Sequence, residues 1–205
     1  MTLKIYGIAA SRALRTLWTA EELGLPYEHV KLSFTDPALK EPAFLALNPN
    51  GAIPVVDDDG IVVFESLAIN LYLARRHGAG SLGPADWAEE AQVLQWTLWA
   101  ATEIESQTRI WVQQMIYLPE AERDPAVVAA ALQALAKRLA IADALLATRP
   151  WLVADRFTVA DLNLAAVLMR FKELGGEAHP HLSAWHQRCM ARPAAQRALA
   201  LRTAG

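Results

Sequence analysis

Residues 3–32 decide the fold, and their sequence is LKIYGIAASRALRTLWTAEELGLPYEHVKL. The apolar stretch Leu3–Tyr6 predicts a short strand. A helical spacing of apolar residues follows from Arg12 to Leu23, and Gly24 ends it. The alternating stretch Tyr27–Leu32 predicts a second strand. A strand, a helix and a strand in this order predict a parallel pair joined by a right-handed crossover.

The following segment adds a predicted hairpin and a second helix to this unit. Ile53–Val56 and Ile61–Phe64 are apolar runs, and the turn sequence DDDG between them has a length typical of a hairpin. A helical pattern then runs from Ser66 to His77, whereas residues 34–47 predict a short helical or irregular connector interrupted by prolines. The first part of the chain is therefore expected to be an α/β domain.

After residue 78 the pattern is helical throughout. Long Ala-, Leu- and Trp-rich stretches predict a helical bundle, with helices at 86–117, 125–147, 158–174 and 181–190 and a last short one after Pro193. The segment GAGSLGP at 78–84 is rich in turn-forming residues. We therefore expect a first domain at 1–78, a linker at 79–85 and an all-helical domain at 86–205.

Composition excludes several classes of protein. Of the 205 residues 54% are hydrophobic and 20% charged, which is enough apolar content for a sizeable core. A net charge of -3 gives no electrostatic case for nucleic acid or an anionic membrane. The single cysteine, Cys189, cannot form an intrachain disulfide. We find no secretion signal and no apolar stretch of the roughly 20 residues that a membrane span needs. A soluble cytoplasmic protein is expected.

Ser11 is the first candidate functional residue, because it lies where the first strand ends and the first helix begins. Free backbone N–H groups and the helix dipole favour negative charge at such a position. A hydroxyl there can stabilise a thiolate, which is the reactive form of sulfur. The alternative is that Ser11 only caps the helix, and from this motif alone the cap is the better interpretation.

Ile53–Pro54 is the second candidate, at the start of a predicted strand after the sequence NPNGA. If that bond is cis, the backbone N–H and C=O of Ile53 are exposed and an extended peptide can pair with them. The alternative is an ordinary trans proline after a turn.

Glu65 and Ser66 form the third candidate, directly after the strand 61–64. Free N–H groups at the start of the next helix can hold a ligand carboxylate, and Glu65 can hold an ammonium group. The alternative is that Ser66 only caps the helix. The three features together favour one site at one edge of the sheet. A thiolate stabiliser, a peptide-binding strand edge and a clamp for a zwitterion suit a small γ-glutamyl thiol peptide.

The sequence resembles the soluble glutathione transferase superfamily over nearly its whole length. The resemblance rests on the segments YGIAASRALRTLWTAEELGLPY, NPNGAIP, FESLAINLYL and FTVADL, at 6–27, 48–54, 64–73 and 157–162. The spacing from Ser11 to Arg15 is similar to the serine-type branch, nearest the theta-like and bacterial classes. The resemblance implies a thioredoxin-like first domain, an all-helical second domain, a detoxification role and a homodimer.

The resemblance also implies roles for individual residues. Ser11 would donate a hydrogen bond to the glutathione sulfur, Ile53 beside cis Pro54 would pair with the cysteinyl backbone, and Glu65 with Ser66 would hold the γ-glutamyl group. Thr158 and Asp161 would form a structural capping box.

Two departures from the family pattern bear on these roles. Members often carry Lys or Arg after the Gly of NPNG, where this chain has Ala52; Lys40 is the candidate to supply that charge. The catalytic cysteine of the omega and beta-like branches is absent, and Cys189 lies far along the chain. Thiol–disulfide exchange by an enzyme cysteine is therefore disfavoured.

The expected reaction is attack of bound glutathione thiolate on a small apolar electrophile. Thr108, Trp111 and Met115 are the candidates for an electrophile site in an apolar cleft between the domains; for each one, core packing or a dimer contact is the commoner role. The alternatives are glutathione-dependent isomerisation, peroxide reduction or dehalogenation, and non-catalytic ligand binding. No metal is expected, because His179, His181 and His186 do not share one helical face.

Overall fold

The computed structural model describes residues 3–203, so the outermost residues of the two predicted domains, 1–2 and 204–205, lie outside the described part. Its contacts divide the chain into two units, residues 1–86 together with 191–205, and residues 87–190. Each unit is described by itself. The placement of a domain border at 78–86 stays a prediction.

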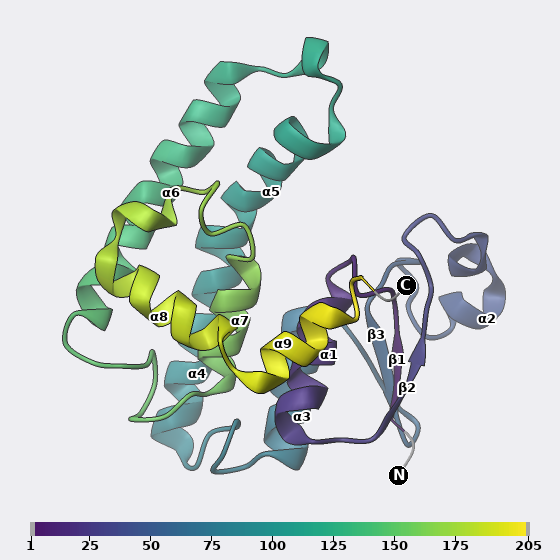
Figure 1. The fold of residues 1–205 in the computed structure, drawn as a ribbon. Coiled ribbons are helices and arrows are strands. Elements are labelled where there is room, and N and C mark those ends of the chain that lie inside the picture. The colour runs from purple at the N-terminus through teal and green to yellow at the C-terminus, as the bar shows by residue number, and fades with distance from the viewer. Residues whose placement is uncertain (1–2, 204–205) are drawn as a thin grey trace. The chain divides into compact units, whose positions relative to one another are not determined.

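The first unit is built on a four-stranded mixed sheet with the order β2-β1-β3-β4 (Figure 1). β1 (Leu3–Tyr6) pairs in parallel with β2 (Tyr27–Val30) and antiparallel with β3 (Val55–Asp58). β3 pairs antiparallel with β4 (Ile61–Phe64). The predicted crossover and hairpin are both present, and this is the thioredoxin-like arrangement.

Helices cover both faces of this sheet. α1 (Ala13–Leu23) and α3 (Ser66–His77) pack on each other and on the strands, so that Ile5 and Val56 are fully buried. The connector forms a short 3-10 turn, η1 (Pro37–Lys40), and α2 (Pro42–Leu45). It buries the other face through a small core, made of Leu39, Phe44 and Val55 with Tyr6, Leu32, Leu47 and Ile53 packed against it.

The C-terminal helix belongs to this first unit. α9 (Pro193–Ala200) packs along α1. Two arginine–glutamate pairs fasten it there, Arg192 to Glu22 at 2.7 Å and Arg197 to Glu21 at 2.6 Å. The chain therefore returns to its first unit after the helical bundle, although the sequence pattern groups these residues with the second domain.

Among its described residues, the second unit contains helices joined by turns and no strand. One long helical run contains α4 (Trp87–Trp99), the π-helical η2 (Ala100–Glu105), α5 (Ser106–Val112) and the π-helical η3 (Gln113–Tyr117). A short turn, η4 (Glu120–Glu122), leads into α6 (Pro125–Leu146), which packs against α5 and forms a helical hairpin with it. The remaining elements are α7 (Val159–Val167), η5 (Gly176–Ala178) and α8 (Pro180–Met190).

α7 is the core of the second unit, because every one of its residues is buried. Thr158 and Asp161 form the predicted capping box at its start. The Asp161 carboxylate also accepts hydrogen bonds from the backbone of Leu152 and the indole of Trp185, both at 2.9 Å. Burial raises the pKa of Asp161, and these donors oppose the rise.

Several predicted boundaries were wrong. β3 begins at Val55 and not at Ile53, because proline lacks the N–H that a ladder needs and the pairing with β1 starts one residue after Pro54. α7 ends at Val167 and not at residue 174, because the backbone of Leu168 has a ψ of 28°, which is outside the helical range. The following residues form turns that stack Phe171 on His186, with ring centroids 4.4 Å apart.

α6 corrects a further expectation. Its 22 residues are long and apolar enough to cross a membrane by length and composition, whereas no such stretch was expected. One such helix is weak evidence for a membrane span, because a helix of a bundle passes the same test. Its buried residues recur at helical spacing and face the unit's interior: Ala131, Leu135, Leu139, Ala142 and Leu146.

Candidate functional site

Three strands have an end at the same end of the sheet, which we call the sheet edge. The register pairs Tyr6 with Val55 and Val55 with Phe64. The chain therefore leaves β1, enters β3 and leaves β4 at the same edge. The segments that follow or precede these ends are the ones in which the sequence predicted a site.

Gly7 brings the first two segments into contact. Its φ of +127° is a conformation that side-chain-bearing residues rarely adopt. A Cβ at this position would lie 2.9 Å from the Cβ of Ala13 and 3.1 Å from that of Ile53. The loop between β1 and α1 is therefore packed directly on Ile53, and only glycine fits between them.

Ser11 lies in this loop, one residue before the N-cap of α1, which is Arg12. Its hydroxyl donates a hydrogen bond to the Ile8 carbonyl at 2.7 Å and accepts one from the Ala13 N–H at 3.1 Å. It therefore satisfies one free N–H of the helix, as a cap does. To donate to a sulfur atom, the hydroxyl must turn away from Ile8.

Ile53 presents a free backbone edge next to this loop. The Ile53–Pro54 peptide is cis. Within residues 3–203, the N–H and the C=O of Ile53 make no backbone hydrogen bond. A hydrogen bond within the preceding turn stabilises it, because the Asn48 side-chain amide donates to the Ala52 carbonyl at 2.7 Å. An extended peptide can pair with this rigid, unpaired edge.

Glu65 has a strained backbone at the third segment. Its φ of 70° and ψ of 109° are rare for a residue with a side chain, and such conformations cost on the order of 1–3 kcal/mol and cluster at functional sites. Glu65, and not Ser66, occupies the N-cap position of α3, so the predicted capping role of Ser66 was wrong. The Glu65 carboxylate is exposed and has no ion-pair partner among the described residues.

Ser66 is the first residue of α3 and is only 4% exposed. Its hydroxyl accepts a hydrogen bond from the Arg15 guanidinium at 3.2 Å. The hydroxyl hydrogen therefore remains to be donated to a ligand. Together with the free N–H groups of the first turn of α3, it forms an arrangement suited to a carboxylate.

Lys40 lies beside the turn that precedes Ile53. A Cβ on Gly51 would approach the Lys40 ammonium to 2.9 Å, so the cation is packed against the backbone next to Ala52. Lys40 is exposed, and within the described part of the chain it has no acidic partner. The position of this charge agrees with the hypothesis that it replaces the basic residue missing at Ala52.

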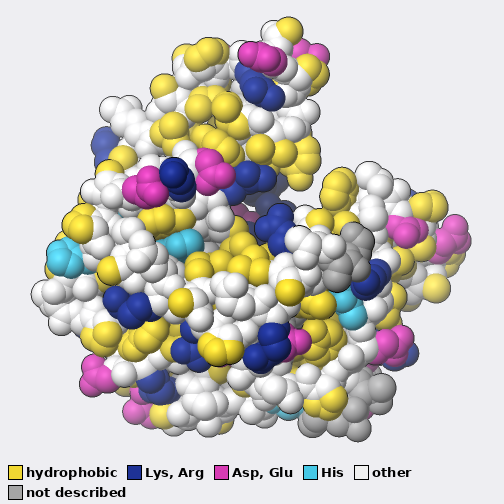
Figure 2. Space-filling model, in the orientation of Figure 1, with side chains coloured by type: hydrophobic (Ala, Val, Ile, Leu, Met, Phe, Trp, Pro, Cys, Tyr) yellow, Lys and Arg dark blue, Asp and Glu magenta, His cyan; other side chains and the backbone are white. Residues whose placement is uncertain are grey.

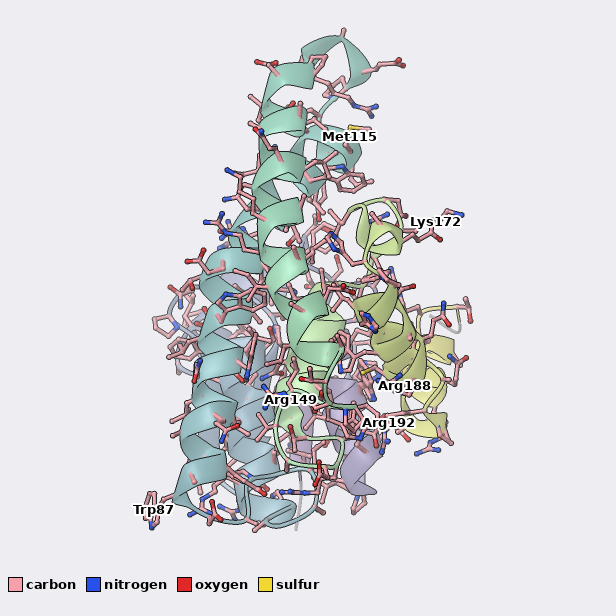
Figure 3. All side chains as sticks on the ribbon, turned by 90° about the vertical axis from the view of Figure 1, so that its left-hand side faces the viewer. Trp87, Met115, Arg149, Lys172, Arg188 and Arg192 are labelled. Atoms are coloured by element: carbon pink, nitrogen blue, oxygen red, sulfur yellow. The ribbon has the colours of Figure 1, made fainter. Side chains whose placement is uncertain are left out.

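The candidates for the electrophile site all lie in the second unit. Thr108 and Trp111 are each 7% exposed. The Arg170 guanidinium lies 6.0 Å from the centroid of the Trp111 ring. Met115 lies near the end of the hairpin (Figure 3), where it lines a pocket. The helix is π-helical from Gln113 onward, and a common face for Trp111 and Met115 stays a prediction.

Among residues 3–203 no cluster of three or more His, Cys, Asp or Glu side chains could hold a metal ion. His186 is buried against Phe171, and Cys189 is buried as well. The candidate site at the sheet edge is therefore made of hydroxyl, carboxylate, ammonium and backbone groups.

Comparison with known proteins agrees with this site. Residues 1–75 match the glutathione S-transferase N-terminal domain, and residues 107–193 match the C-terminal domain of the same proteins. Glutathione S-transferase 4 of Zea mays is 34% identical, covering 95% of this chain and 90% of the maize protein. The chain belongs to the glutathione S-transferase family.

Two further relatives place it within that family. Glutathione S-transferase GstB of Escherichia coli K12 is 32% identical, covering 89% of this chain and 90% of the other. The theta-class glutathione S-transferase of Xanthomonas axonopodis pv. citri, whose crystal structure has glutathione bound, is 37% identical with a TM-score of 0.87, and 96% of each chain is covered. The resemblance to theta-like and bacterial members is thereby supported.

Two residues of this glutathione S-transferase were given no role by the sequence. Arg15 was noted only for its spacing from Ser11, yet it holds the hydroxyl of Ser66. His29 of β2 places its Nε2 2.8 Å from the Gly7 carbonyl and so ties β2 to the loop that carries Ser11. Neither contact has a local signal, because the partners are 51 and 22 residues apart.

Proposed function

We propose that this glutathione S-transferase catalyses attack of bound glutathione thiolate on a small apolar electrophile and serves in detoxification. The meeting of the Ser11 loop, the free edge of Ile53 and the Glu65–Ser66 turn at one sheet edge carries the proposal. Relatives that share nearly the whole chain are named as glutathione S-transferases. Catalysis comes from stabilising the thiolate and from holding both reactants together.

Each part of glutathione has a complementary group at this edge. Ser11, after its hydroxyl turns, donates to the sulfur atom. The backbone of Ile53 beside Pro54 pairs with the cysteinyl residue, and Glu65 with Ser66 holds the ammonium and carboxylate of the γ-glutamyl group. Lys40 binds the glycine carboxylate from the turn beside Ala52. No metal takes part in this scheme.

The electrophile is held by the helical unit. Thr108 and Trp111 are buried side chains of this unit and stay the candidates for this role, whereas Met115 lines a pocket that neither of them lines. A substrate panel identifies the electrophile and separates conjugation from isomerisation, peroxide reduction and dehalogenation.

We also infer that two copies form a homodimer in the cytoplasm. Exposed apolar side chains, which in monomers rarely form large patches, occur in both units. On β4 they are Ile61 and Phe64, 43% and 36% exposed; on α4 they are Trp87 and Leu98, 81% and 61% exposed (Figure 3). Sedimentation equilibrium of the wild type and of Leu98→Glu tests the dimer, and a monomeric wild type would contradict it.

Titration of bound glutathione tests the role of Ser11. A hydrogen bond to a charged group contributes about 1.5–3 kcal/mol, so Ser11→Ala is expected to raise the pKa of the bound thiol by roughly one to two units. The thiolate absorbance in the ultraviolet gives this pKa directly. The matched control is Ser33→Ala, which changes a half-buried serine of the same unit whose hydroxyl bonds to that of Thr35. An unchanged thiol pKa in Ser11→Ala would remove Ser11 from its role.

Calorimetry with glutathione separates the enzyme from a non-catalytic protein of the same fold. Binding at or below millimolar glutathione together with turnover supports the proposal. Absence of binding by the wild type at millimolar glutathione would favour the non-catalytic alternative. Ala52 is the feature that suggests this alternative, because family members often carry Lys or Arg at that position.

A further inference from the structure

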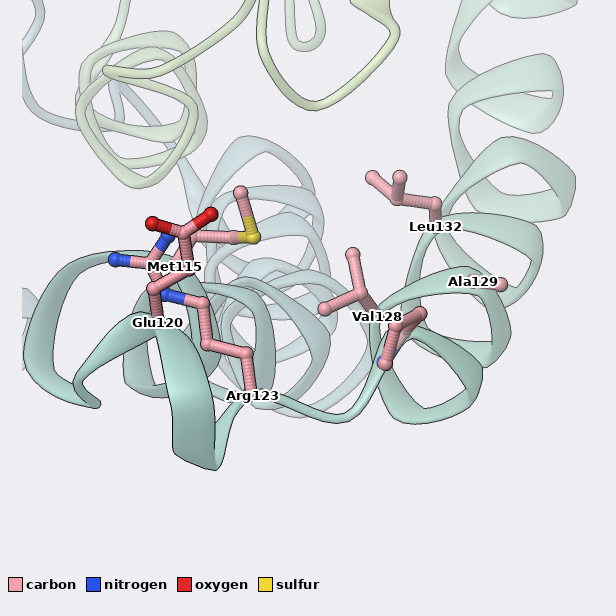
Figure 4. A pocket seen from close by; sticks show the side chains of 7 residues that line it. Met115, Glu120, Arg123, Val128, Ala129 and Leu132 are labelled. Atoms are coloured by element: carbon pink, nitrogen blue, oxygen red, sulfur yellow. The ribbon is translucent and has the colours of Figure 1, made fainter.

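A pocket lies at the end of the helical hairpin, within the second unit. Its volume is about 480 Å³, which is in the range of small-molecule sites. One wall is the first two turns of α6, where Pro125, Val128, Ala129 and Leu132 present apolar surface. Met115, Glu120 and Arg123 form the facing wall (Figure 4).

The facing wall carries two opposite charges that do not pair with each other. Glu120 and Arg123 are three residues apart across the 3-10 turn η4, a spacing that places side chains on the same side. Among residues 3–203 neither side chain has an ion-pair partner within 4.0 Å. A carboxylate that only accepts hydrogen bonds and a guanidinium that only donates them therefore stand next to each other, both open to the pocket.

The wall is held in place by bonds within the turn. The Nε of Arg123 donates to the Leu118 carbonyl at 3.2 Å, which leaves the terminal N–H groups of the guanidinium for a ligand. The Asp124 N–H donates to the Gln114 side chain at 2.8 Å. Met115 and Gln114 both belong to the π-helical η3. π-helical turns are rare in proteins, and those that occur are often found at functional sites.

The surface around the pocket is also apolar. Figure 2 shows hydrophobic side chains gathered over the end of the α5–α6 hairpin, with acidic and basic side chains at its tip. Ile116 and Tyr117 next to the pocket are 45% and 62% exposed. A ligand with an apolar body therefore meets apolar surface on entry and against α6.

The charge pair selects the head group of such a ligand. An anionic head is attracted by Arg123 and repelled by Glu120, and a cationic head meets the reverse. An apolar head would remove water from both charged groups and offer them no hydrogen bond in its place, which costs free energy. A neutral head that both accepts and donates satisfies the two groups at once.

We propose that this pocket binds a neutral small molecule with an apolar body and a carboxamide-type head, which accepts from Arg123 and donates to Glu120. The body packs between Met115 and the wall of Val128 and Leu132, where the flexible thioether adapts to an aromatic ring. The site uses only residues of the second unit, so it does not depend on the glutathione site at the sheet edge.

The test compares two probes that differ only in their head group, 1-naphthaleneacetamide and 1-naphthaleneacetate. Their dissociation constants are measured by calorimetry on the full-length protein, saturated with S-methylglutathione so that the glutathione site is filled. We expect the wild type to bind the amide at least tenfold more tightly than the acetate.

Charge variants then assign this preference to the two residues. Glu120→Gln removes the repulsion of the acetate and is expected to reduce the preference at least fivefold, whereas Glu122→Gln, in the same turn but outside the pocket, leaves it unchanged. Arg123→Gln is expected to raise the dissociation constant of the amide at least fivefold. Lys137→Gln, an exposed cation elsewhere on α6, is its control.

Three results would overturn the proposal. They are equal or tighter binding of the acetate by the wild type, no binding of either probe up to its solubility, and the same effect from Glu120→Gln and Glu122→Gln. Glutathione binding is measured on the same samples without S-methylglutathione. Failure of the pocket and failure of the proposed transferase function are therefore distinguished.

Discussion

The guanidinium of Arg15 donates a hydrogen bond to the hydroxyl of Ser66 at 3.2 Å, and both side chains are buried. This contact joins α1 to the start of α3, so the helix that begins next to Ser11 also positions the far end of the proposed glutathione site. The oxygen of Ser66 accepts from Arg15, so its hydrogen is left for a group bound at the helix start.

Arg15→Met is expected to weaken glutathione binding more than it slows the chemical step. The variant keeps the length and apolar stem of the side chain but removes the donor and the charge behind Ser66. A hydrogen bond involving a charged group is worth about 1.5–3 kcal/mol, so the KM for glutathione should rise about tenfold or more while kcat changes little.

Arg15→Lys separates charge from geometry in the same experiment. Lysine keeps the positive charge but not the planar donor, so an intermediate KM is expected. Thermal unfolding of both variants shows whether the fold survives. A folded Arg15→Met protein with wild-type affinity for glutathione would show that the contact plays no part in binding.

The strained backbone of Glu65 gives a second prediction, from a pair of substitutions. Glu65→Ala and Glu65→Gly both remove the carboxylate and are expected to lose glutathione affinity to a similar extent. Only glycine adopts a φ of 70° without strain, so the glycine variant should be more stable than the alanine variant by about 1 kcal/mol. Denaturant unfolding measures this difference, and an alanine variant as stable as the glycine variant would contradict it.

The sequence predicted the elements around the site because local signals mark them. β1, β4 and α3 have the predicted bounds, since each is a short apolar run or a periodic helix between clear turn residues. The expectation that Ser11, Pro54 and Glu65 lie at one end of the sheet followed from strand order alone. The contact of Gly7 with Ile53 could not be predicted, because it depends on how closely a loop packs on a distant strand.

Features set by tertiary packing were missed for the same reason. Nothing in the sequence at 168–174 stops a helix before Gly175, yet the chain turns there so that Phe171 stacks on His186. The π-helical turn at Gln113–Tyr117 was likewise not predicted, because it has no recognised residue pattern. The open hydrogen bonds of Glu120 and Arg123 likewise depend on the shape of the hairpin turn.

A buried acid, Asp58, gives a third prediction. It is the last residue of β3 and lies at the end of that strand away from the candidate site. One oxygen of Asp58 accepts from His77 at 2.8 Å and from Tyr72 at 2.9 Å, and Arg76 lies 3.2 Å away. Burial alone would raise the pKa of Asp58, but these donors and charges hold it below its ordinary value. The carboxylate is therefore stabilised more in the folded than in the unfolded chain.

The stability supplied by Asp58 should be fully present above the pKa of an unfolded aspartate and be lost as the pH falls below about 4. Asp58→Asn should lower the free energy of unfolding at pH 7 by on the order of 3 kcal/mol, because it removes the anion beside Arg76 and the carboxylate that bonds to His77 and Tyr72. Tyr72→Phe, which removes one donor, should cost about 1 kcal/mol. Equal stability of wild type and Asp58→Asn at pH 7 would contradict this account.

His186 gives the last prediction, in a different pH range. Burial between Phe171 and the core lowers the pKa of His186 to about 4, against a usual value of 6.5, although its hydrogen bonds to backbone groups of Ala165 and Leu168 oppose the shift. The folded protein thus holds this ring neutral, while the unfolded chain binds a proton below pH 6.5. Stability should fall as the pH is lowered from 6.5 to 4, by about 3 kcal/mol from this group.

His186→Phe removes the titration and keeps a ring to stack on Phe171. The free energy of unfolding, measured with denaturant at pH 7 and at pH 4.5, should therefore fall less in this variant than in the wild type. His181→Gln, an exposed histidine of the same helix, should follow the wild type. If His186→Phe lost as much stability as the wild type between the two pH values, the neutral ring would not be the cause, because the variant has no proton to take up at that position.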